Sequence, residues 1–165
     1  MSEIFLEKLF EHNNWANLQI LEACSLLTDE QLDAQPQSAT KGSIRQTLTH
    51  LVSSQHGYLS LLTLPVDARH RISPSFVELQ ESVRTSGQGL LALVRGKSGN
   101  DLKTRLQTTD GYSVEPWVIM VQIINHATEH REQINSMLSA LGRTPPELDG
   151  WAYGETTNAL VRIST

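Results

Sequence analysis

The sequence predicts an all-α protein with the architecture of an up-and-down-type four-helix bundle. Four long segments carry apolar residues at helical spacing, and capping sequences, proline or glycine mark most of their ends. Only one short stretch, before the fourth segment, has the pattern of strands. A chain of 165 residues is long enough to bury a core without disulfides or a structural metal, so we expect a single domain over residues 1–165.

The first two long helices are expected on either side of a short helical turn. Apolar periodicity covers residues 2–27, and residues 28–31 (TDEQ) then form a capping box that restarts a helix. Residues 36–42 read as a polar loop. Residues 43–46 (SIRQ) form a second capping box, which opens a helix that reaches about Leu62.

The third long helix is expected to begin at Ser73 as N-cap, with Pro74 in the first helical position. It should end near Arg95, because Gly96 is a typical helix stop.

The last third of the chain combines a hairpin signal with two more helices. Residues 101–115 place T-D-G at 109–111 between two strand-like runs, which predicts a short β-hairpin or an extended crossover. Pro116 then lies in the first turn of the fourth long helix, which should end near Leu141 before a glycine. A short C-terminal helix capped by Asp149 completes the expected fold.

Composition excludes several classes of partner. A net charge of −5 and the absence of basic runs argue against nucleic acid. No stretch approaches the length of apolar residues that a membrane span needs, and the N-terminus lacks the pattern of a signal peptide. Cys24 is the only cysteine and lies on an apolar stripe, so we expect a small buried hydrophobe in a cytoplasmic protein.

The candidate chemistry lies in residues 126–130, HATEH. His126 and His130 are four residues apart and therefore share one helix face, where two buried imidazoles each need a partner. A single histidine of this kind is usually a core residue, but a pair can be satisfied by one divalent cation. The stretch also fits the H-x-x-E-H motif of some zinc peptidases, with Glu129 as base. Too little chain follows it for the rest of such an enzyme, so Glu129 is better explained as a solvated residue or a hydrogen-bond partner of a ligand histidine.

A third ligand is expected from the second long helix, which contains His50 and His56. These two point about 240° apart around the helix axis, so only one can face the same ion. Periodicity leaves the choice open, although the small residues Ser54 and Gly57 on the face of His50 favour that residue because a ligand site needs space. The interior asparagines of the first helix, Asn13, Asn14 and Asn17, are expected either to bond across the bundle near the site or to face solvent.

Three blocks of sequence resemble the DinB-like, or YfiT-like, family of four-helix-bundle metal proteins. They are NNWAN at 13–17, SIRQTLTHLV at 43–52 and NHATEHREQI at 125–134. The resemblance covers nearly the whole chain, including the hairpin-like stretch and the PPELD segment after the fourth helix.

The resemblance implies specific ligands. It places the metal on His50, His126 and His130, and it puts Gln133 close to the ion, in contact with a ligand, cofactor or substrate. The chain departs from the family pattern at Glu132, where glycine is frequent, and at Tyr58, where tryptophan is frequent.

The same resemblance implies a metal-dependent enzyme. Three neutral histidines leave a divalent ion its charge and an open position, and zinc, nickel, manganese and iron all suit such a site. Relatives include transferases and isomerases that use low-molecular-weight thiols, so we expect a thiol-dependent transferase, or a hydrolase, that acts on a small-molecule substrate. A non-catalytic metal-binding or structural bundle is the alternative. The family also suggests a homodimer.

Overall fold

The computed structural model describes residues 2–37, 42–96, 102 and 104–163. Its α-helices are α1 (Ser2–Ser25), α2 (Asp29–Asp33), α3 (Ile44–Thr63), α4 (Leu79–Val94), α5 (Pro116–Ala140) and α6 (Gly150–Thr156). Two 3₁₀ turns, η1 (Val66–Ala68) and η2 (Phe76–Glu78), lie between α3 and α4, and a hairpin of β1 (Leu106–Gln107) and β2 (Ser113–Val114) precedes α5. The predicted all-α bundle with a short hairpin and a C-terminal helix is confirmed.

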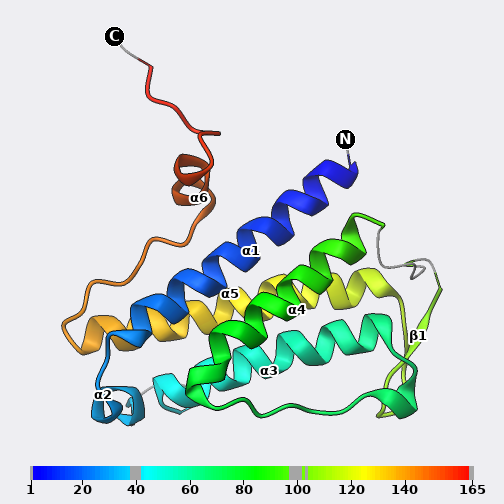
Figure 1. The fold of residues 1–165 in the computed structure, drawn as a ribbon, viewed down its shortest axis with the longest axis horizontal. Coiled ribbons are helices and arrows are strands. Elements are labelled where there is room, and N and C mark those ends of the chain that lie inside the picture. Colours follow the sequence, from blue (N-terminus) through cyan, green and yellow to red (C-terminus); the bar gives the residue numbers. More distant parts are fainter. Residues whose placement is uncertain (1, 38–41, 97–101, 103, 164–165) are drawn as a thin grey trace.

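The four long helices form a ring in which α1 and α3 each pack against both α4 and α5 (Figure 1). Consecutive long helices do not all run in opposite directions. Gln55 of α3 meets Val83 of α4. Four residues later on α3, Leu59 lies beside Gly89, which is six residues later on α4, so α3 and α4 run parallel. Residues 64–78 make this possible, because they run back along the bundle from the end of α3 to the start of α4 (Figure 1).

Local capping explains where the helices begin. Thr28 and Ser43 form the two predicted capping boxes that open α2 and α3. The predicted start at Ser73 and Pro74 is wrong, because the helical segment begins after Ser75. The carboxylate of Glu78 accepts hydrogen bonds from the backbone N–H of Ser75 at 2.8 Å and from its hydroxyl at 2.6 Å, and this pair outcompetes the earlier start signal.

The remaining elements agree with the sequence. The two strands pair antiparallel, with Leu106 opposite Val114, and Gly111 takes a positive φ of 92° in the turn between them. Gly142, with a φ of 70°, follows the end of α5. The Asp149 side chain accepts a hydrogen bond from the backbone of Ala152 and so caps α6. In the parts of the chain that the structure describes, none of the helices combines the length and the apolar character that crossing a membrane requires.

The interior of the bundle consists of two apolar clusters on either side of a polar layer. One cluster lies toward the ends of the bundle where α1 finishes and α3 begins, and includes Ile20, Leu48 and Ile134. The other lies toward the hairpin and includes Phe10 and Ile123. Between them, buried polar side chains come from all four long helices: Asn13, Asn17, Gln55, Ser86, His130 and Arg131. This layer determines where the chemistry of the protein can lie.

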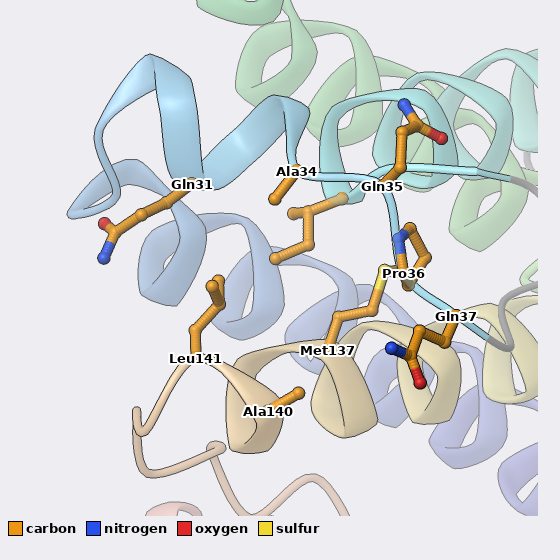
Figure 2. Close-up of a pocket in the computed structure, with 9 residues that line it drawn as sticks. Gln31, Ala34, Gln35, Pro36, Gln37, Met137, Ala140 and Leu141 are labelled. Atoms are coloured by element: carbon orange, nitrogen blue, oxygen red, sulfur yellow. The ribbon is translucent and has the colours of Figure 1, made fainter.

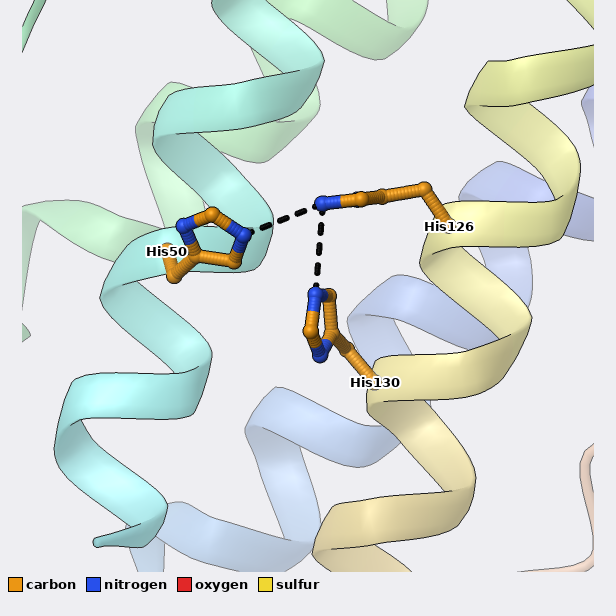
Figure 3. Close-up of side chains that lie close together, drawn as sticks. All are labelled: His50, His126 and His130. Carbon is orange, nitrogen blue, oxygen red and sulfur yellow. Dashed lines mark hydrogen bonds between the residues drawn. The ribbon is translucent and has the colours of Figure 1, made fainter. Parts of the chain in front are cut away.

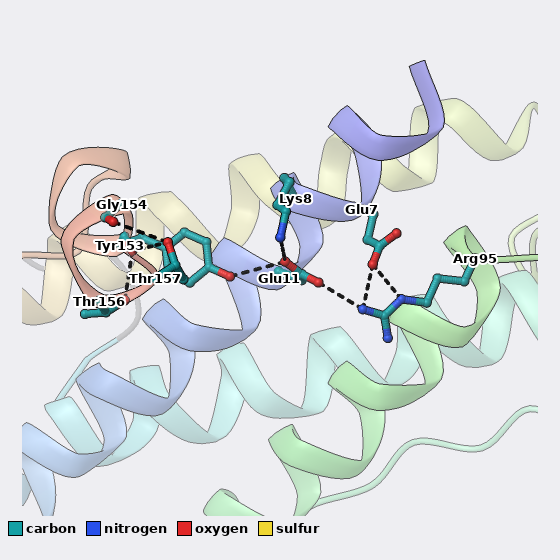
Figure 4. A network of polar contacts seen from close by, with 8 residues as sticks. All are labelled: Glu7, Lys8, Glu11, Arg95, Tyr153, Gly154, Thr156 and Thr157. Carbon is teal, nitrogen blue, oxygen red and sulfur yellow. Dashed lines mark hydrogen bonds and ion pairs between the residues drawn. The ribbon is translucent and has the colours of Figure 1, made fainter. Parts of the chain in front are cut away.

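A network of charges at the surface joins α1 to its neighbours (Figure 4). Arg95, just after α4, pairs with Glu7 at 2.7 Å and with Glu11 at 2.9 Å. Glu11 also pairs with Lys8 and accepts a hydrogen bond from the hydroxyl of Tyr153 in α6. The bond from Lys8, followed by the charges of Lys8 and Arg95, lowers the pKa of Glu11. These contacts position α6 against α1, on the side of the ring away from α3.

Candidate metal centre

Three histidines meet across the seam between α3 and α5 (Figure 3). The Nε2 atom of His126 lies 3.0 Å from Nε2 of His50 and 3.2 Å from Nε2 of His130. One ligand atom from each residue lies within 4.8 Å of the other two. The predicted set is therefore brought together, and the choice that helical periodicity left open between His50 and His56 falls to His50.

His56 lies elsewhere on α3, with its ring centre 6.1 Å from that of His70 in the connection to α4. Burial, followed by the charge of His70, lowers the pKa of His56. Its Nδ1 atom is buried and has no hydrogen-bond partner among the described residues.

The nitrogen separations match a shared cation. Histidine nitrogens bound to one Zn²⁺ at about 2.1 Å lie about 3.0–3.4 Å apart when the bond angles are roughly 90–110°. The distances from His126 to His50 and to His130, 3.0 and 3.2 Å, fall in this range. The third pair, His50 and His130, lies within 4.8 Å, so the three nitrogens are close enough together to hold one metal ion.

Gln133 fixes the tautomer of His130. His130 precedes Gln133 by three residues on α5, and the side-chain oxygen of Gln133 lies 2.8 Å from Nδ1 of His130. An amide oxygen only accepts hydrogen bonds, so Nδ1 of His130 carries the proton and donates it. The lone pair of His130 is therefore on Nε2, the atom that faces His126. This is the arrangement that outer partners of metal-bound histidines produce.

The hydrogen-bonding capacity of neutral imidazoles also favours an ion. His126 Nε2 offers either one proton or one lone pair, yet it faces the Nε2 atoms of both other histidines. A single proton cannot make two full hydrogen bonds in different directions. A cation accepts a lone pair from each of the three nitrogens, so the donor set suits a divalent transition metal.

The cluster is buried on one side and accessible on the other. His130 is 3% exposed, whereas His50 and His126 are half-buried. The ring of Tyr58, one of the two departures from the family pattern, stands edge-on to His126 with ring centres 5.6 Å apart. An ion at the three nitrogens would therefore be within reach of a small molecule from the seam, with Tyr58 as one wall.

Arg131 is the centre of the polar layer on the other side of α5. Its guanidinium is 3% exposed and donates hydrogen bonds to the side-chain oxygens of Asn13 at 2.9 Å and Asn17 at 2.6 Å. A further bond goes to the hydroxyl of Thr128. Among the described residues, no carboxylate lies within ion-pair distance of this arginine. Within the described residues, the charge is thus satisfied by neutral oxygens.

The layer continues through Gln55 to α4. The side-chain oxygen of Gln55 accepts a bond from Asn17 at 2.9 Å, and its amide donates to the carbonyl of Val83 and to the hydroxyl of Ser86. Asn13 and Asn17 therefore bond across the bundle, which settles the alternatives that their sequence positions left open. Asn14 faces α4 instead, where it donates to the carbonyl of Gly87 at 2.9 Å.

Burial of the Arg131 cation costs free energy. Desolvation lowers its pKa from 12.5 to about 10, and the nearby charge of Glu132 opposes this effect only in part. A fall of that size corresponds to about 3 kcal/mol against burying the charge. The side chain is still a cation at neutral pH, so a positive charge lies in the interior at the level of the histidine cluster.

A comparison with models of known families gives a match over most of the chain. The family model described as DinB family matches residues 1–161. The chain belongs to the DinB family. No curated protein matches the chain in a search for similar sequences.

Within this DinB protein, the structure also places the other residues named from the sequence. Glu129 is exposed, and it is Gln133 that holds Nδ1 of His130. Cys24 is fully buried, and this burial raises the pKa of its thiol to about 12. Glu132 is exposed and lies near Arg131.

Sequence reasoning missed Arg131 and Gln55. A signal for each was present, because both interrupt an apolar helical stripe: Arg131 stands four residues after Ala127 and seven before Leu138, and Gln55 four residues after Leu51. A charged or amide side chain in such a position must find partners inside the bundle.

Proposed function

We propose that this DinB protein is a metal-dependent enzyme of the thiol-dependent transferase type, with hydrolysis as the main variant. His50, His126 and His130 would hold a divalent transition metal, and Gln133 would hold the ring of His130 in the ligating tautomer. The observation that carries the proposal is the convergence of three Nε2 atoms at 3.0 and 3.2 Å with one accessible side.

The chemistry follows from the charge of the donor set. Three neutral imidazoles do not reduce the charge of a divalent ion, which when bound lowers the pKa of a coordinated water or thiol and polarises a carbonyl. The protein residues bind and orient: His130 is locked by Gln133, and Tyr58 limits the space beside His126. The interior cation of Arg131 adds positive potential, which favours an anionic group at the open side of the cluster.

Metal content tests the first step. Protein purified without an affinity tag is compared with a His126→Ala/His130→Ala variant, with Gln122→Ala on the exposed face of α5 as a matched control. We expect about one equivalent of a transition metal in the parent and in Q122A, and a loss of nearly all of it in the double variant. Less than about 0.1 equivalent in the parent after reconstitution would contradict the ligand assignment.

Thermal shifts with a panel of small thiols test the second step. A thiol that binds the native, metal-loaded protein raises its melting temperature through linkage, by an amount that increases with thiol concentration. A metal-loaded protein that no thiol stabilises, and that hydrolyses no ester or amide in a substrate screen, would support the non-catalytic alternative instead. The expected homodimer, small-molecule substrate, cytoplasmic location and lack of nucleic-acid binding stay predictions.

A further inference from the structure

A cavity of about 280 Å³ opens at the end of the bundle where α3 begins and α5 ends (Figure 2). Its apolar walls come from Pro36 in the segment after α2, from Ile44 at the start of α3, and from Met137 and Leu141 at the end of α5. In Figure 2 the side chain of Met137 reaches towards Pro36 across this space. Several lining residues, including Ala34 and Ala140, are exposed, so the cavity is open to solvent, and an apolar hollow of this size suits a ligand group.

The polar atoms around the cavity are neutral. Gln31, Gln35 and Gln37 contribute side-chain amides, and none of the described residues that line the space carries a charge. A charged group placed there would lose its hydration without gaining an ion pair. The lining therefore selects an uncharged, mainly apolar group, with amides available at the rim for a hydroxyl or carbonyl.

The cavity and the histidine cluster lie on the same seam. Met137 follows His130 by seven residues, which is two turns on the same face of α5 and about 10 Å along its axis. On the antiparallel partner α3, Ile44 precedes His50 by six residues, or about 9 Å. Gln133 is half-buried between the two sites on α5. The separation of the cavity from the cluster along these helices is therefore about 10 Å, which is the length of a small elongated molecule.

We propose that this cavity binds the uncharged, apolar end of the substrate, while a donor atom at the substrate's other end reaches the metal held by His50, His126 and His130. The proposal rests on the proposed function, because it assumes a metal at the cluster. It adds the substrate class: an elongated small molecule with an anionic or chelating head and a neutral tail of about 10 Å.

Straight-chain alkyl hydroxamates test it, because the hydroxamate head chelates metals and the tail can be lengthened. Binding to the Zn²⁺-loaded full chain is measured by calorimetry for acetohydroxamate, decanohydroxamate and a hydroxamate of equal length that ends in an ammonium group. Each methylene buried in the cavity should tighten binding by about fourfold, so we expect decanohydroxamate to bind at least about 10²-fold more tightly than acetohydroxamate. The ammonium compound should bind no more tightly than acetohydroxamate.

A bulky side chain in the cavity should remove the gain. Ala140 lines the space, and Ala140→Phe should bring decanohydroxamate to within about threefold of acetohydroxamate. Ser136→Phe, an exposed position one turn earlier on α5, is the matched control and should keep the full difference. Ala34→Phe fills the cavity from the other wall and replaces A140F if that variant does not fold.

The outcomes separate the two proposals. If acetohydroxamate does not bind the Zn²⁺-loaded protein, the metal-centre function fails. If acetohydroxamate and decanohydroxamate bind with equal affinity, the metal centre stands and the cavity proposal is overturned. The same holds if A140F and A34F still bind decanohydroxamate as much more tightly than acetohydroxamate as the parent does.

Discussion

The hydrogen bond between Gln133 and His130 should be worth a measurable part of the metal affinity. Replacing Gln133 with methionine keeps the length and volume of the side chain but removes the oxygen that lies 2.8 Å from Nδ1 of His130. The imidazole then no longer has a fixed tautomer, and part of its population presents a protonated Nε2 to the ion. Loss of such an outer partner typically weakens metal binding by about 10–100-fold.

The structure narrows the expected loss of metal affinity in Gln133→Met. Gln133 is half-buried, so water can replace the lost acceptor in part, and we expect the lower half of the range, about 10–30-fold or roughly 1.4–2 kcal/mol. Gln133→Glu should behave in the opposite way. A carboxylate accepts a stronger, charge-assisted bond from His130 and places a negative charge near the cation, so its affinity should equal or exceed that of the parent.

Competition for Zn²⁺ against a chromophoric chelator at one fixed pH gives the affinities of untagged protein and variants. Gln122→Met is the matched control, because Gln122 is an exposed glutamine of the same helix. Circular dichroism establishes that all variants keep their helices. If Q133M binds Zn²⁺ within about twofold of Q122M, Gln133 does not orient a ligand and the tautomer argument is wrong.

Three further predictions concern the rest of the fold. Cys24, whose burial raises the thiol pKa to about 12, should not react with an aromatic disulfide reagent at pH 8 until the protein is unfolded; native reactivity at the unfolded rate would contradict its burial. The folded-state pKa of His56 lies below its ordinary value of 6.5, so the unfolded chain binds the proton more readily and the free energy of unfolding should fall as the pH drops through 6.5. Urea titrations at several pH values should show a smaller fall in His56→Gln than in the parent, and equal falls would refute the assignment. A Cβ on Gly87 would lie 2.8 Å from the Asn14 side chain, so Gly87→Ala should lower the free energy of unfolding by about 1–3 kcal/mol despite the better helix propensity of alanine. This loss is measured by thermal or urea unfolding, and Asn14→Ala should restore part of it. Gly57→Ala, where nothing lies within 4 Å of the added atom, is its control and should be neutral or stabilising.

Local signals in the sequence were enough to predict most of the fold. The capping boxes at Thr28 and Ser43, and the glycine after α5, act within a single turn of backbone and do not depend on the rest of the chain. The start of the helical segment before α4 is misplaced because two start signals, at Ser73 and at Ser75, compete within three residues. The choice between them depends on the hydrogen bonds from Ser75 to Glu78, which need side-chain geometry. The parallel course of α3 and α4 depends on the path of a long connection, for which periodicity has no signal.

The residues of the candidate site likewise divide into those that the sequence predicts and those that need the structure. The shared face of His126 and His130 follows from their spacing on one helix, and the resemblance to the DinB family added His50. Periodicity alone could not choose between His50 and His56, because the choice depends on which neighbouring helix each face meets. The role of Gln133 in holding His130 needed side-chain geometry.

The polar layer explains why residues from different helices meet at one level of the bundle. Apolar side chains pack well at more than one register, so the two hydrophobic clusters alone do not determine how far α5 slides along α1. Arg131 donates hydrogen bonds to Asn13 and Asn17, which are four residues apart on α1. A shift of α5 by one turn along α1 would leave one of these buried oxygens without its donor, at a cost of about 1–3 kcal/mol. Gln55 extends the same constraint to α3 and α4, and α3 carries the third histidine. The hydrogen bonds of the buried guanidinium thus favour one register over its neighbours. In that register, Nε2 of His50 and Nε2 of His130 lie within 3.2 Å of Nε2 of His126.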